Sequence, residues 1–509
     1  MSLKNYLIVA VLTITCLQLQ AKDYRTSLFG IHSDGITLNT RSIQYAIDFI
    51  SQNGGGRLVF NVGRYLTGSI HLKSNVTLHL EEGAVLLGSL NPWDYDKKVW
   101  TAVVFAHDQQ NIGITGQGVI DGRGRYIARN IVDMIHKGLI KDLFRQDRPE
   151  AETRPVLAYI RNCENVNVKG VTMQNSSSWV QIYDQCKNVA IDSITVDSKA
   201  YWNNDGIDIV DCDGVTVTNS FIDSDDDGIC LKSHDASKVC KNILVRNCTI
   251  RSSANGIKFG TASYGGFSNV KIYNVKIFDT YRSAVTLQAV DGGFVENVIV
   301  DSLKAYNTGN AIFLRIGERV KGKKGRMENI SISNMYVEVP ATKPDAGYEY
   351  EGPIEDMPRN ISPSGIVGMP DAVITNVTLK NIEVKMPGGG NPMFAKIGLD
   401  ELDKVPEKPT FYPEFSMFDE LPAWGLYMRH AKDIKISNLT LSCEKKDYRT
   451  AIVADDVHGV TFEGIKVTQP GVATPGVATP GVATPGVASP GAAKNFIHTH
   501  KSTGVVTKK

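Results

Sequence analysis

Four aspartates crowd into five positions of the segment FIDSDDDGICLKS, residues 221–233. They are Asp223, Asp225, Asp226 and Asp227. Carboxylates packed this densely repel one another when ionised, and each raises the pKa of its neighbours. A chain accepts such crowding for a metal ion, for acid–base chemistry, or because the turn is simply solvated.

A second acidic position lies one repeat away. The triplet DGI occurs at residues 205–207 and again at 227–229, an offset of 22 residues. In both copies the third and fifth residues of the unit are apolar, which is the alternation of a half-buried strand. The same register recurs in SWVQIY, DGIDIV, DGICLK, NGIKFG, SAVTLQ and NAIFLR, which begin at residues 178, 205, 227, 255, 283 and 310. Each offset fits one turn of a coil, and stacked turns lie about 4.8 Å apart.

This register predicts that Asp205 lies directly beneath Asp227, with Asp226 beside them. Three carboxylates at one rim meet the requirement of glycosidic hydrolysis, in which one carboxylic acid protonates the leaving oxygen and another carboxylate activates water. Mutual repulsion helps to keep one of the three protonated near neutral pH. Asp205, Asp226 and Asp227 are therefore the candidate catalytic residues.

Calcium binding and a solvated turn are the alternatives. The segment DSDDDG, residues 223–228, matches the opening of a calcium loop. The twelfth position of that loop is His234 instead of glutamate, and no helical pattern flanks it. A solvated turn leaves the DGI triplet one coil away unexplained. We expect no metal and no cofactor.

The fourth and sixth residues of each unit point away from the core, on the surface that carries the candidate acids. We expect them to form a polar row that binds a substrate. The polar candidates in this row are Asp208, Lys232, Lys258, Gln288 and Arg315.

A longer repeat indicates how these units are positioned. Asparagine or glycine, then valine or isoleucine and alternating apolar residues, recurs at Asn75, Asn111, Asn165, Asn188, Gly214, Asn242, Asn269, Asn297, Asn329, Asn376 and Gly459. The central spacings are 23, 26, 28, 27 and 28 residues, without a helical stripe of useful length. Such strands favour a coil of parallel strands, a β-helix, since propeller blades need about 40 residues per repeat. Cysteines at one position of the repeat predict a row of small buried thiols: Cys163, Cys186, Cys212 and Cys240.

The ends and loops of the coil are also predictable. A coil needs a cap, and residues 40–56 supply a short helix for which Thr40 is a suitable N-cap and Gly54 a stop. Its apolar face consists of Ile43, Ala46, Ile47 and Ile50. The intervals 112–164, 330–375 and 377–432 are expected to hold loops that form the walls of a groove.

The chain divides into four segments. Residues 1–21 read as a signal peptide, so the mature protein is expected to be exported to the periplasm or the cell exterior. Residues 22–469 form the predicted coil and catalytic domain. Residues 470–491 repeat PGVAT and predict an extended linker, and residues 492–509 a basic tail.

The overall charge excludes some classes of partner. Lys+Arg is 55 against Asp+Glu 54, so no global field favours nucleic acid or an anionic membrane. No apolar run after residue 21 is long enough to span a membrane. We expect a monomer.

The pair WNNDGIDIVDC and FIDSDDDGICLKS resembles the paired signatures of the polygalacturonases, family 28 of the glycoside hydrolases. The resemblance extends to about residue 467. It implies a right-handed, single-stranded parallel β-helix and hydrolysis with inversion at the anomeric carbon. It also implies that Asp226 is the general acid and that Asp205 and Asp227 position and activate water, with Asn203 and Asn204 beside the substrate.

Two signatures of that family are altered here. Its Gly-His-Gly aligns with Ala254-Asn255-Gly256, and its Arg-Ile-Lys aligns with Thr286-Leu287-Gln288. Asn255 is therefore a further candidate for substrate binding, and Lys258 and Arg315 on neighbouring turns are candidates to replace the lost cations. The loss favours a branched or mixed pectin, because rhamnogalacturonan hydrolases of this family also look to lack that histidine.

Two other functions fit the same coil. A polysaccharide lyase would need calcium carboxylates and a basic proton acceptor. A non-catalytic carbohydrate-binding relative is compatible with the altered signatures, although it has no reason to keep three crowded carboxylates.

Overall fold

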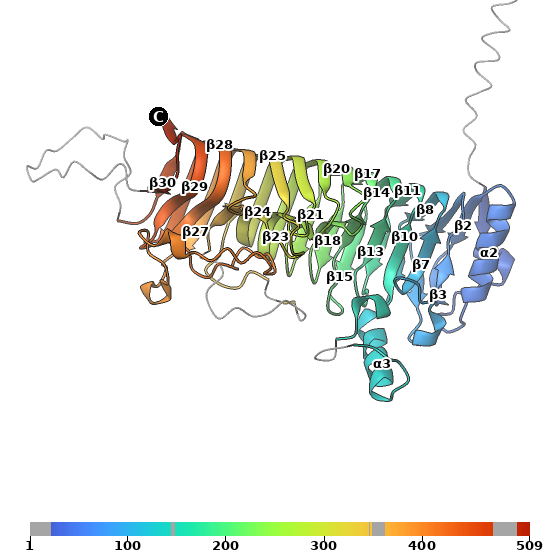
Figure 1. Ribbon diagram of the computed structural model, residues 1–509. Helices are drawn as coiled ribbons and strands as arrows, with labels where there is room; N and C mark the ends of the chain where they lie inside the picture. The colour runs from blue at the N-terminus through green and yellow to red at the C-terminus, as the bar shows by residue number, and fades with distance from the viewer. Residues whose placement is uncertain (1–21, 144–147, 346, 349–361, 472–495, 509) are drawn as a thin grey trace, which may run out of the picture.

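The strands of this protein stack into one long coil. The computed structural model describes residues 22–143, 148–345, 347–348, 362–471 and 496–508, and Figure 1 shows it as an elongated stack of strands. Every pairing between the strands in these ranges that form ladders is parallel. The predicted β-helix is therefore confirmed. The signal peptide and most of the linker lie outside the described residues.

The coil has three columns of strands. The first column contains β4 (Ile70–His71), β7 (Ala102–His107), β10 (Val156–Arg161), β13 (Gln181–Asp184), β16 (Ile207–Val210), β19 (Ile229–Ser233), β22 (Ile257–Ser263), β26 (Ser364–Val367) and β31 (Ile497–His500). The second contains β1 (Asp23–Arg25), β2 (Gly56–Phe60), β5 (Val76–Leu80), β8 (Gln110–Gly116), β11 (Glu164–Lys169), β14 (Lys187–Asp192), β17 (Asp213–Thr218), β20 (Cys240–Arg246) and β32 (Val506–Lys508). The third contains β3 (Gly63–Thr67), β6 (Ala84–Gly88), β9 (Val119–Asp121), β12 (Thr172–Gln174), β15 (Thr195–Ser198), β18 (Phe221–Ser224), β21 (Thr249–Ser252) and β30 (Lys466–Thr468).

Towards the C-terminus the strands run through the corners and join the columns. These long strands are β23 (Phe267–Ala289), β24 (Phe294–Ile316), β25 (Arg326–Glu338), β27 (Ile374–Gly388), β28 (Ala423–Lys445) and β29 (Thr450–Glu463). Strand β23, for example, pairs in turn with β20, β21 and β22. One strand can therefore contribute to all three faces of the coil.

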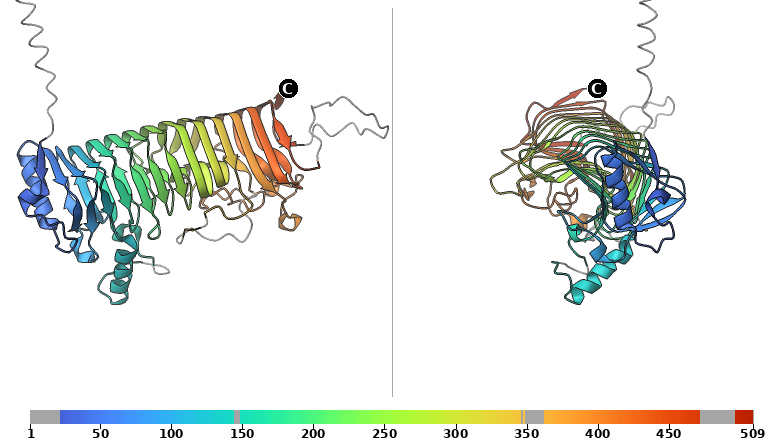
Figure 2. Two further views of the ribbon diagram at one scale, coloured as in Figure 1. Left: turned by 180° about the vertical axis from the view of Figure 1, so that it is seen from behind. Right: turned by 90° about the vertical axis from the view of Figure 1, so that its right-hand side faces the viewer.

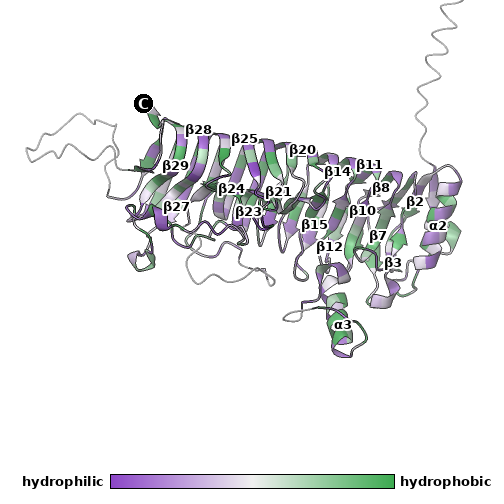
Figure 3. Cartoon of the chain, viewed as in Figure 1, coloured by the Kyte–Doolittle hydropathy of each residue, from purple (hydrophilic) through white to green (hydrophobic). Residues whose placement is uncertain are grey.

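Alternation along each strand fills the interior of the coil. Figure 3 shows apolar and polar residues alternating along the strands, and the inward residues form one continuous apolar core. Each buried isoleucine, leucine or valine contributes roughly 1.5–3 kcal/mol relative to an exposed one. The cysteines lie in this core as predicted: all seven in the described residues are free and buried. Cys186 connects neighbouring turns, since its N–H donates to the Cys212 sulfur at 3.3 Å.

Asparagines form ladders at the corners. The repeat asparagines have φ between 52° and 66°, a conformation that asparagine tolerates better than most residues. Their side chains then hydrogen-bond from turn to turn, for example Asn111 to Asn75 at 2.9 Å and Asn376 to Asn329 at 2.7 Å. The repeated asparagine thus marks each corner and holds it to the next.

Helix α2 (Thr40–Gln52) caps the N-terminal end, and Figure 2 shows it lying across the coil. Its buried residues are the four predicted from the sequence: Ile43, Ala46, Ile47 and Ile50. Thr40 is not the N-cap as expected, because the helix begins there. Its hydroxyl instead accepts a hydrogen bond from the Gly68 N–H at 2.8 Å and ties the helix to the coil.

Two of the predicted loops project from the coil, and residues 349–361 of the third, in the interval 330–375, lie outside the described residues. Helix α3 (Gly124–His136) stands out from the interval 112–164, as Figure 1 shows. Short 3-10 turns occupy other connections: η1 (Thr26–Phe29), η2 (Pro92–Asp94), η3 (Ala151–Thr153), η5 (Pro392–Phe394) and η6 (Leu402–Lys404). The segment 389–422, which contains η5 and η6, carries Tyr412 into the region of the candidate acids.

The prediction that residues 492–509 form a basic tail outside the coil is corrected by the structure. Residues 497–500 and 506–508 form β31 and β32, and both strands pair with β29. His500 Nδ1 lies 2.7 Å from Asp455 Oδ1, and Phe496 and Ile497 pack against the core. The coil therefore continues beyond residue 469, because these residues cover a strand edge that would otherwise be unpaired.

Candidate active site

The two DGI triplets stack in the predicted register. Ile207 pairs with Ile229, and the Gly206 N–H donates to the Asp227 carbonyl at 2.9 Å. A Cβ added at Gly206 would lie 2.6 Å from the Gly228 carbonyl oxygen. Contacts this close exclude any side chain, so glycine after each aspartate lets consecutive turns approach. The expected stacking of Asp205 beneath Asp227 is confirmed.

One register prediction is wrong. The unit beginning at residue 178 was expected to place Gln181 beneath Asp208, but Ile182 pairs with Asp208 instead. Strand β13 begins only at Gln181, and both Val180 and Tyr183 turn into the core. The ladder is therefore displaced by one residue at this turn.

Asp227 is bound on both of its oxygens. Lys258 Nζ lies 2.8 Å from Asp227 Oδ2, while the side-chain and main-chain N–H groups of Asn255 donate to Asp227 Oδ1 at 2.8 and 3.1 Å. Asp226 accepts from the Asp227 N–H at 3.0 Å, and Asn203 Nδ2 lies 3.4 Å from its other oxygen. Hydrogen bonds from cationic and amide donors stabilise the charged form of a carboxylate, and Asp227 receives the stronger set.

Asp205 shares a lysine with a second carboxylate. Lys232 Nζ lies 3.1 Å from Asp205 Oδ2 and 3.0 Å from Asp208 Oδ1. The same ammonium lies 4.3 Å from the centre of the Trp179 ring. Asp208 is fully buried beneath the lysine, so it is a support for Lys232 and not a contact for substrate.

The electrostatics separate the three candidate acids. Burial and the neighbouring charge of Asp227 raise the pKa of Asp226. Burial also acts to raise the pKa of Asp227, but Lys258 and Lys232 outweigh it and the pKa is lowered. Burial holds the pKa of Asp205 well above its usual value despite Lys232, and raises that of Asp208 to about 7. Asp227 is therefore the most readily ionised of the three candidate acids.

An open cleft of about 210 Å³ lies over these residues. Besides the candidate acids and the two lysines, it is lined by Trp179, Asn203, His234, Thr261, Ala262 and Tyr412. Tyr412 is about half exposed, and its hydroxyl lies 3.1 Å from Lys258 Nζ. Burial, with Lys232 nearby, lowers the pKa of His234, so the imidazole is neutral at neutral pH. The aromatic rings of Trp179 and Tyr412 in the lining suit the apolar faces of a sugar ring.

Two of the proposed substrate contacts, Asp208 and Asn255, are buried supports that do not line the cleft, and three more lie elsewhere. Asn204 is fully buried, and its side-chain amide donates to the carbonyls of Ser176 and Ser178 at 3.1 and 2.8 Å. The amide of Gln288, also fully buried, donates to Pro413 at 2.8 Å beneath the segment 389–422. Both side chains hold the main chain in place.

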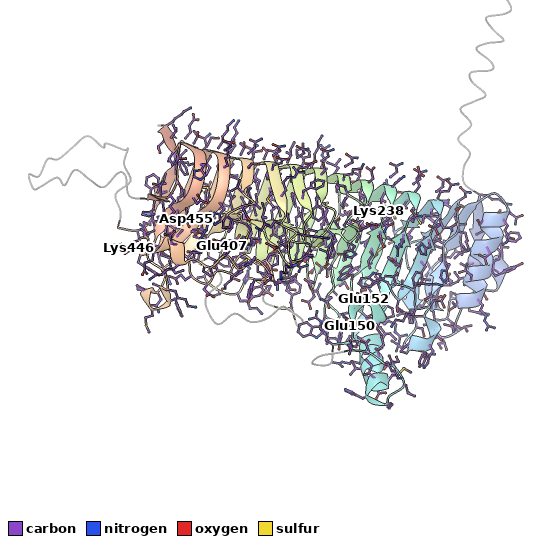
Figure 4. All side chains as sticks on the ribbon, in the orientation of Figure 1. Glu150, Glu152, Lys238, Glu407, Lys446 and Asp455 are labelled. Atoms are coloured by element: carbon purple, nitrogen blue, oxygen red, sulfur yellow. The ribbon has the colours of Figure 1, made fainter. Side chains whose placement is uncertain are left out.

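Arg315 is the third misplaced contact. Its guanidinium is buried and donates to the carbonyls of Gly368 at 3.0 Å and Glu407 at 2.5 Å. Figure 4 shows Glu407 over the C-terminal half of the coil. Arg315 therefore anchors the segment 389–422 and cannot replace a lost cation in the cleft.

Sequence reasoning missed residues that arrive from distant segments. Arg154 is buried and donates to Asn203 Oδ1 at 2.9 Å, which orients the amide that faces Asp226. Arg282 pairs with Glu414 at 2.9 Å, and its charge lowers the pKa values of the neighbouring carboxylates, opposing their burial. Because Glu414 lies 132 residues from Arg282, no local sequence motif predicts this ion pair.

The acidic segment does not converge on a calcium ion. Asp223 points to Tyr348 at 2.8 Å and Lys199 at 2.7 Å, whereas Asp227 faces the cleft. Among the described residues, the group with metal-ligand spacing is Asp205, Asp227 and Cys230, whose ligand atoms lie within 4.8 Å of one another. Lys232 and Lys258 already contact these carboxylates, so this trio is built around ammonium groups.

The sequence matches the model of a known enzyme family. The profile described as Glycosyl hydrolases family 28 matches residues 58–281, which include all three candidate acids. Residues 58–281 belong to this family. Exopolygalacturonase B of Aspergillus niger is 26% identical over 70% of this chain and 84% of its own length. A probable polygalacturonase of Vitis vinifera is 27% identical over 53% of this chain, and the alignment spans 58% of the grape protein.

The family 28 assignment agrees with the fold. The structure of an exopolygalacturonase from Yersinia enterocolitica is 20% identical, covers 96% of this chain and 78% of that chain, and has a TM-score of 0.59. The protein is thus a glycoside hydrolase of the polygalacturonase-like type that acts on pectin. No helix in the described residues is long and apolar enough to cross a membrane.

Proposed function

We propose that this enzyme hydrolyses galacturonate-containing linkages of a pectic chain with inversion at the anomeric carbon. The observation that carries the proposal is the division of the three carboxylates, in which Asp226 has a raised pKa and Asp227 a lowered one. Pairs of carboxyl groups whose pKa values are pushed apart supply the acid and the base of one reaction.

In this mechanism Asp226 donates its proton to the glycosidic oxygen as the bond to the leaving sugar breaks. Asp227 accepts a proton from water, which attacks the anomeric carbon from the opposite face. Asp205 hydrogen-bonds the same water, because one of its carboxylate oxygens lies within 4.8 Å of a carboxylate oxygen of Asp227. Lys258 and Asn255 keep Asp227 ionised and correctly turned.

The cleft also suits an acidic sugar. Lys232 and Lys258 line it together with Trp179 and Tyr412, so a uronate carboxylate meets ammonium groups and a sugar ring meets aromatic faces. Rhamnogalacturonan is the second candidate, favoured by the absence of the family's Arg-Ile-Lys cations at Thr286 and Gln288. Because pectin lies outside cells, we further propose that residues 1–21 direct export. Fractionation of cells that express the protein with or without residues 1–21 tests this proposal, since only the protein with these residues should leave the cytoplasm.

The decisive experiment replaces Asp226 by asparagine, which keeps the shape and removes the proton. Turnover is expected to fall about 10²–10⁴-fold, because that is the usual worth of general acid catalysis. Oligosaccharide affinity, measured by calorimetry, is expected to persist. Asp223→Asn is the matched control in the same turn and should keep turnover within a few fold, since Asp223 faces away from the cleft.

The wild type should be assayed in parallel on homogalacturonan and rhamnogalacturonan oligosaccharides, with the anomer of the first product followed by NMR. New reducing ends with inverted configuration support the proposal. Retained configuration would show a covalent nucleophile, and an unsaturated product would show a lyase. Binding without turnover on every substrate would favour the non-catalytic alternative.

A further inference from the structure

A second hollow lies outside the catalytic cleft. It encloses about 640 Å³ over the third column, at the corner where this column meets the second, and we call it the lysine groove. The residues that matter here are Lys276, Lys304, Tyr306, Asn247, Asn274 and Asn334. It shares no lining residue with the cleft, which lies on the first column.

Two exposed lysines lie side by side in this groove. Lys276 and Lys304 are directly opposite each other on adjacent turns, where like charges in neighbouring strands are destabilising. Within the described residues neither has an ion-pair partner, and the nearby Asp301 is engaged by Ser333 at 2.6 Å. Lys276 Nζ lies 5.6 Å from the centre of the Phe278 ring, so the groove presents two positive charges without a carboxylate partner, separated by about one coil turn, ~4.8 Å.

Aromatic and amide groups accompany these charges. Tyr306 is half-buried in the groove and its ring lies 5.7 Å from that of Tyr336 on the next turn. The corner asparagines also line the groove, with Asn274 donating to Asn247 at 2.8 Å. Ammonium groups bind carboxylates, amides bind hydroxyls, and aromatic faces bind sugar rings. This combination selects an acidic carbohydrate.

We propose that the lysine groove binds a galacturonate-bearing stretch of the pectic polymer apart from the catalytic cleft. The choice of occupant rests on the proposed function. A uronan carries one carboxylate per sugar, so consecutive carboxylates meet the consecutive lysines of adjacent turns. Because the net charge of the chain is only +1, attraction has to come from such a local pair. The groove retains the polymer on the enzyme, while short oligosaccharides use the cleft alone.

The test compares Lys276→Glu/Lys304→Glu with Lys271→Glu/Lys435→Glu. The control changes the same charge at two exposed lysines that point outward from the second column, on strands β23 and β28. Binding of polygalacturonate is measured in the Asp226→Asn background, and hydrolysis of polygalacturonate and of trigalacturonate in the active enzyme. The substitutions replace two expected lysine–galacturonate ion pairs by repulsive contacts, which should weaken polymer binding about tenfold. Trimer hydrolysis should be unchanged.

The effect should shrink as salt is raised from 0.05 to about 0.5 M, because exposed charges are then screened. The groove proposal would be refuted if Lys276→Glu/Lys304→Glu bound polygalacturonate as tightly as the wild type. It would also be refuted if the control pair lost as much affinity. Neither result would affect the proposed function. If the wild type hydrolysed neither substrate, the proposed function would be refuted. The proposal that galacturonate occupies the groove would then be refuted as well, because it rests on that function.

Discussion

Replacing Lys258 by methionine tests whether this ammonium group keeps Asp227 ionised. The two groups are buried, with Lys258 Nζ 2.8 Å from Asp227 Oδ2. Two charges about 4 Å apart at an effective dielectric constant near 20 interact by roughly 4 kcal/mol, which equals about 3 pKa units. Lys232 still lies nearby, so we expect the pKa of Asp227 to rise by about 1–3 units.

The assay is the pH dependence of kcat/KM on a short galacturonan oligosaccharide, followed by new reducing ends. The lowered pKa of Asp227 means that the base is active above this pKa and is protonated below it. Removing Lys258 should therefore move the acidic limb of the profile upward by about 1–3 pH units. Lys258 also lowers the pKa of Asp226, opposing burial and Asp227, so the alkaline limb should move upward by a smaller amount.

Lys258→Arg is the matched control, because it retains the charge and should leave the acidic limb close to its wild-type position. Thermal unfolding of both variants checks that the coil is intact. An acidic limb that stays in place in a folded Lys258→Met protein would refute the assignment of Asp227 as the base held by this lysine. Asp227→Asn then serves to show whether the limb belongs to Asp227 at all.

Three further outcomes follow from the packing. Gly228→Ala should cost about 1–3 kcal/mol in denaturant unfolding, because the new Cβ would lie 2.4 Å from Ile250; an unchanged midpoint would contradict this. Arg315→Met should cost about 1–3 kcal/mol by leaving buried carbonyls unpaired, with kcat/KM and limited proteolysis of residues 389–422 as further measurements; full stability would show that Arg315 is not an anchor. Truncation after residue 470 should lower the melting temperature by at least about 2 °C, because it removes β31 and β32, and an unchanged value would favour a free tail.

The sequence by itself determined the coil and the heart of the site. Alternation with a period of two can be satisfied only by strands with one face inside, and a repeated asparagine at each corner fixes where turns occur. The 22-residue offset of the DGI triplets then sets Asp205 beneath Asp227, because hydrogen bonding between parallel strands fixes which residues are neighbours. The four buried positions of α2 follow from helical periodicity in the same way.

The tertiary structure alone decided what covers the coil. Gln288 and Arg315 occupy outward positions of the register, yet the segment 389–422 folds over them and leaves Lys258 in the cleft beside Tyr412. Tyr412 is 154 residues from Lys258, and no strand periodicity specifies where such a long connection packs. Its path depends on the burial of its own apolar residues and on carbonyls that buried donors such as Gln288 and Arg315 satisfy. Alternation assigns a side chain to a face of the coil, whereas the packing of distant segments decides whether that face meets substrate.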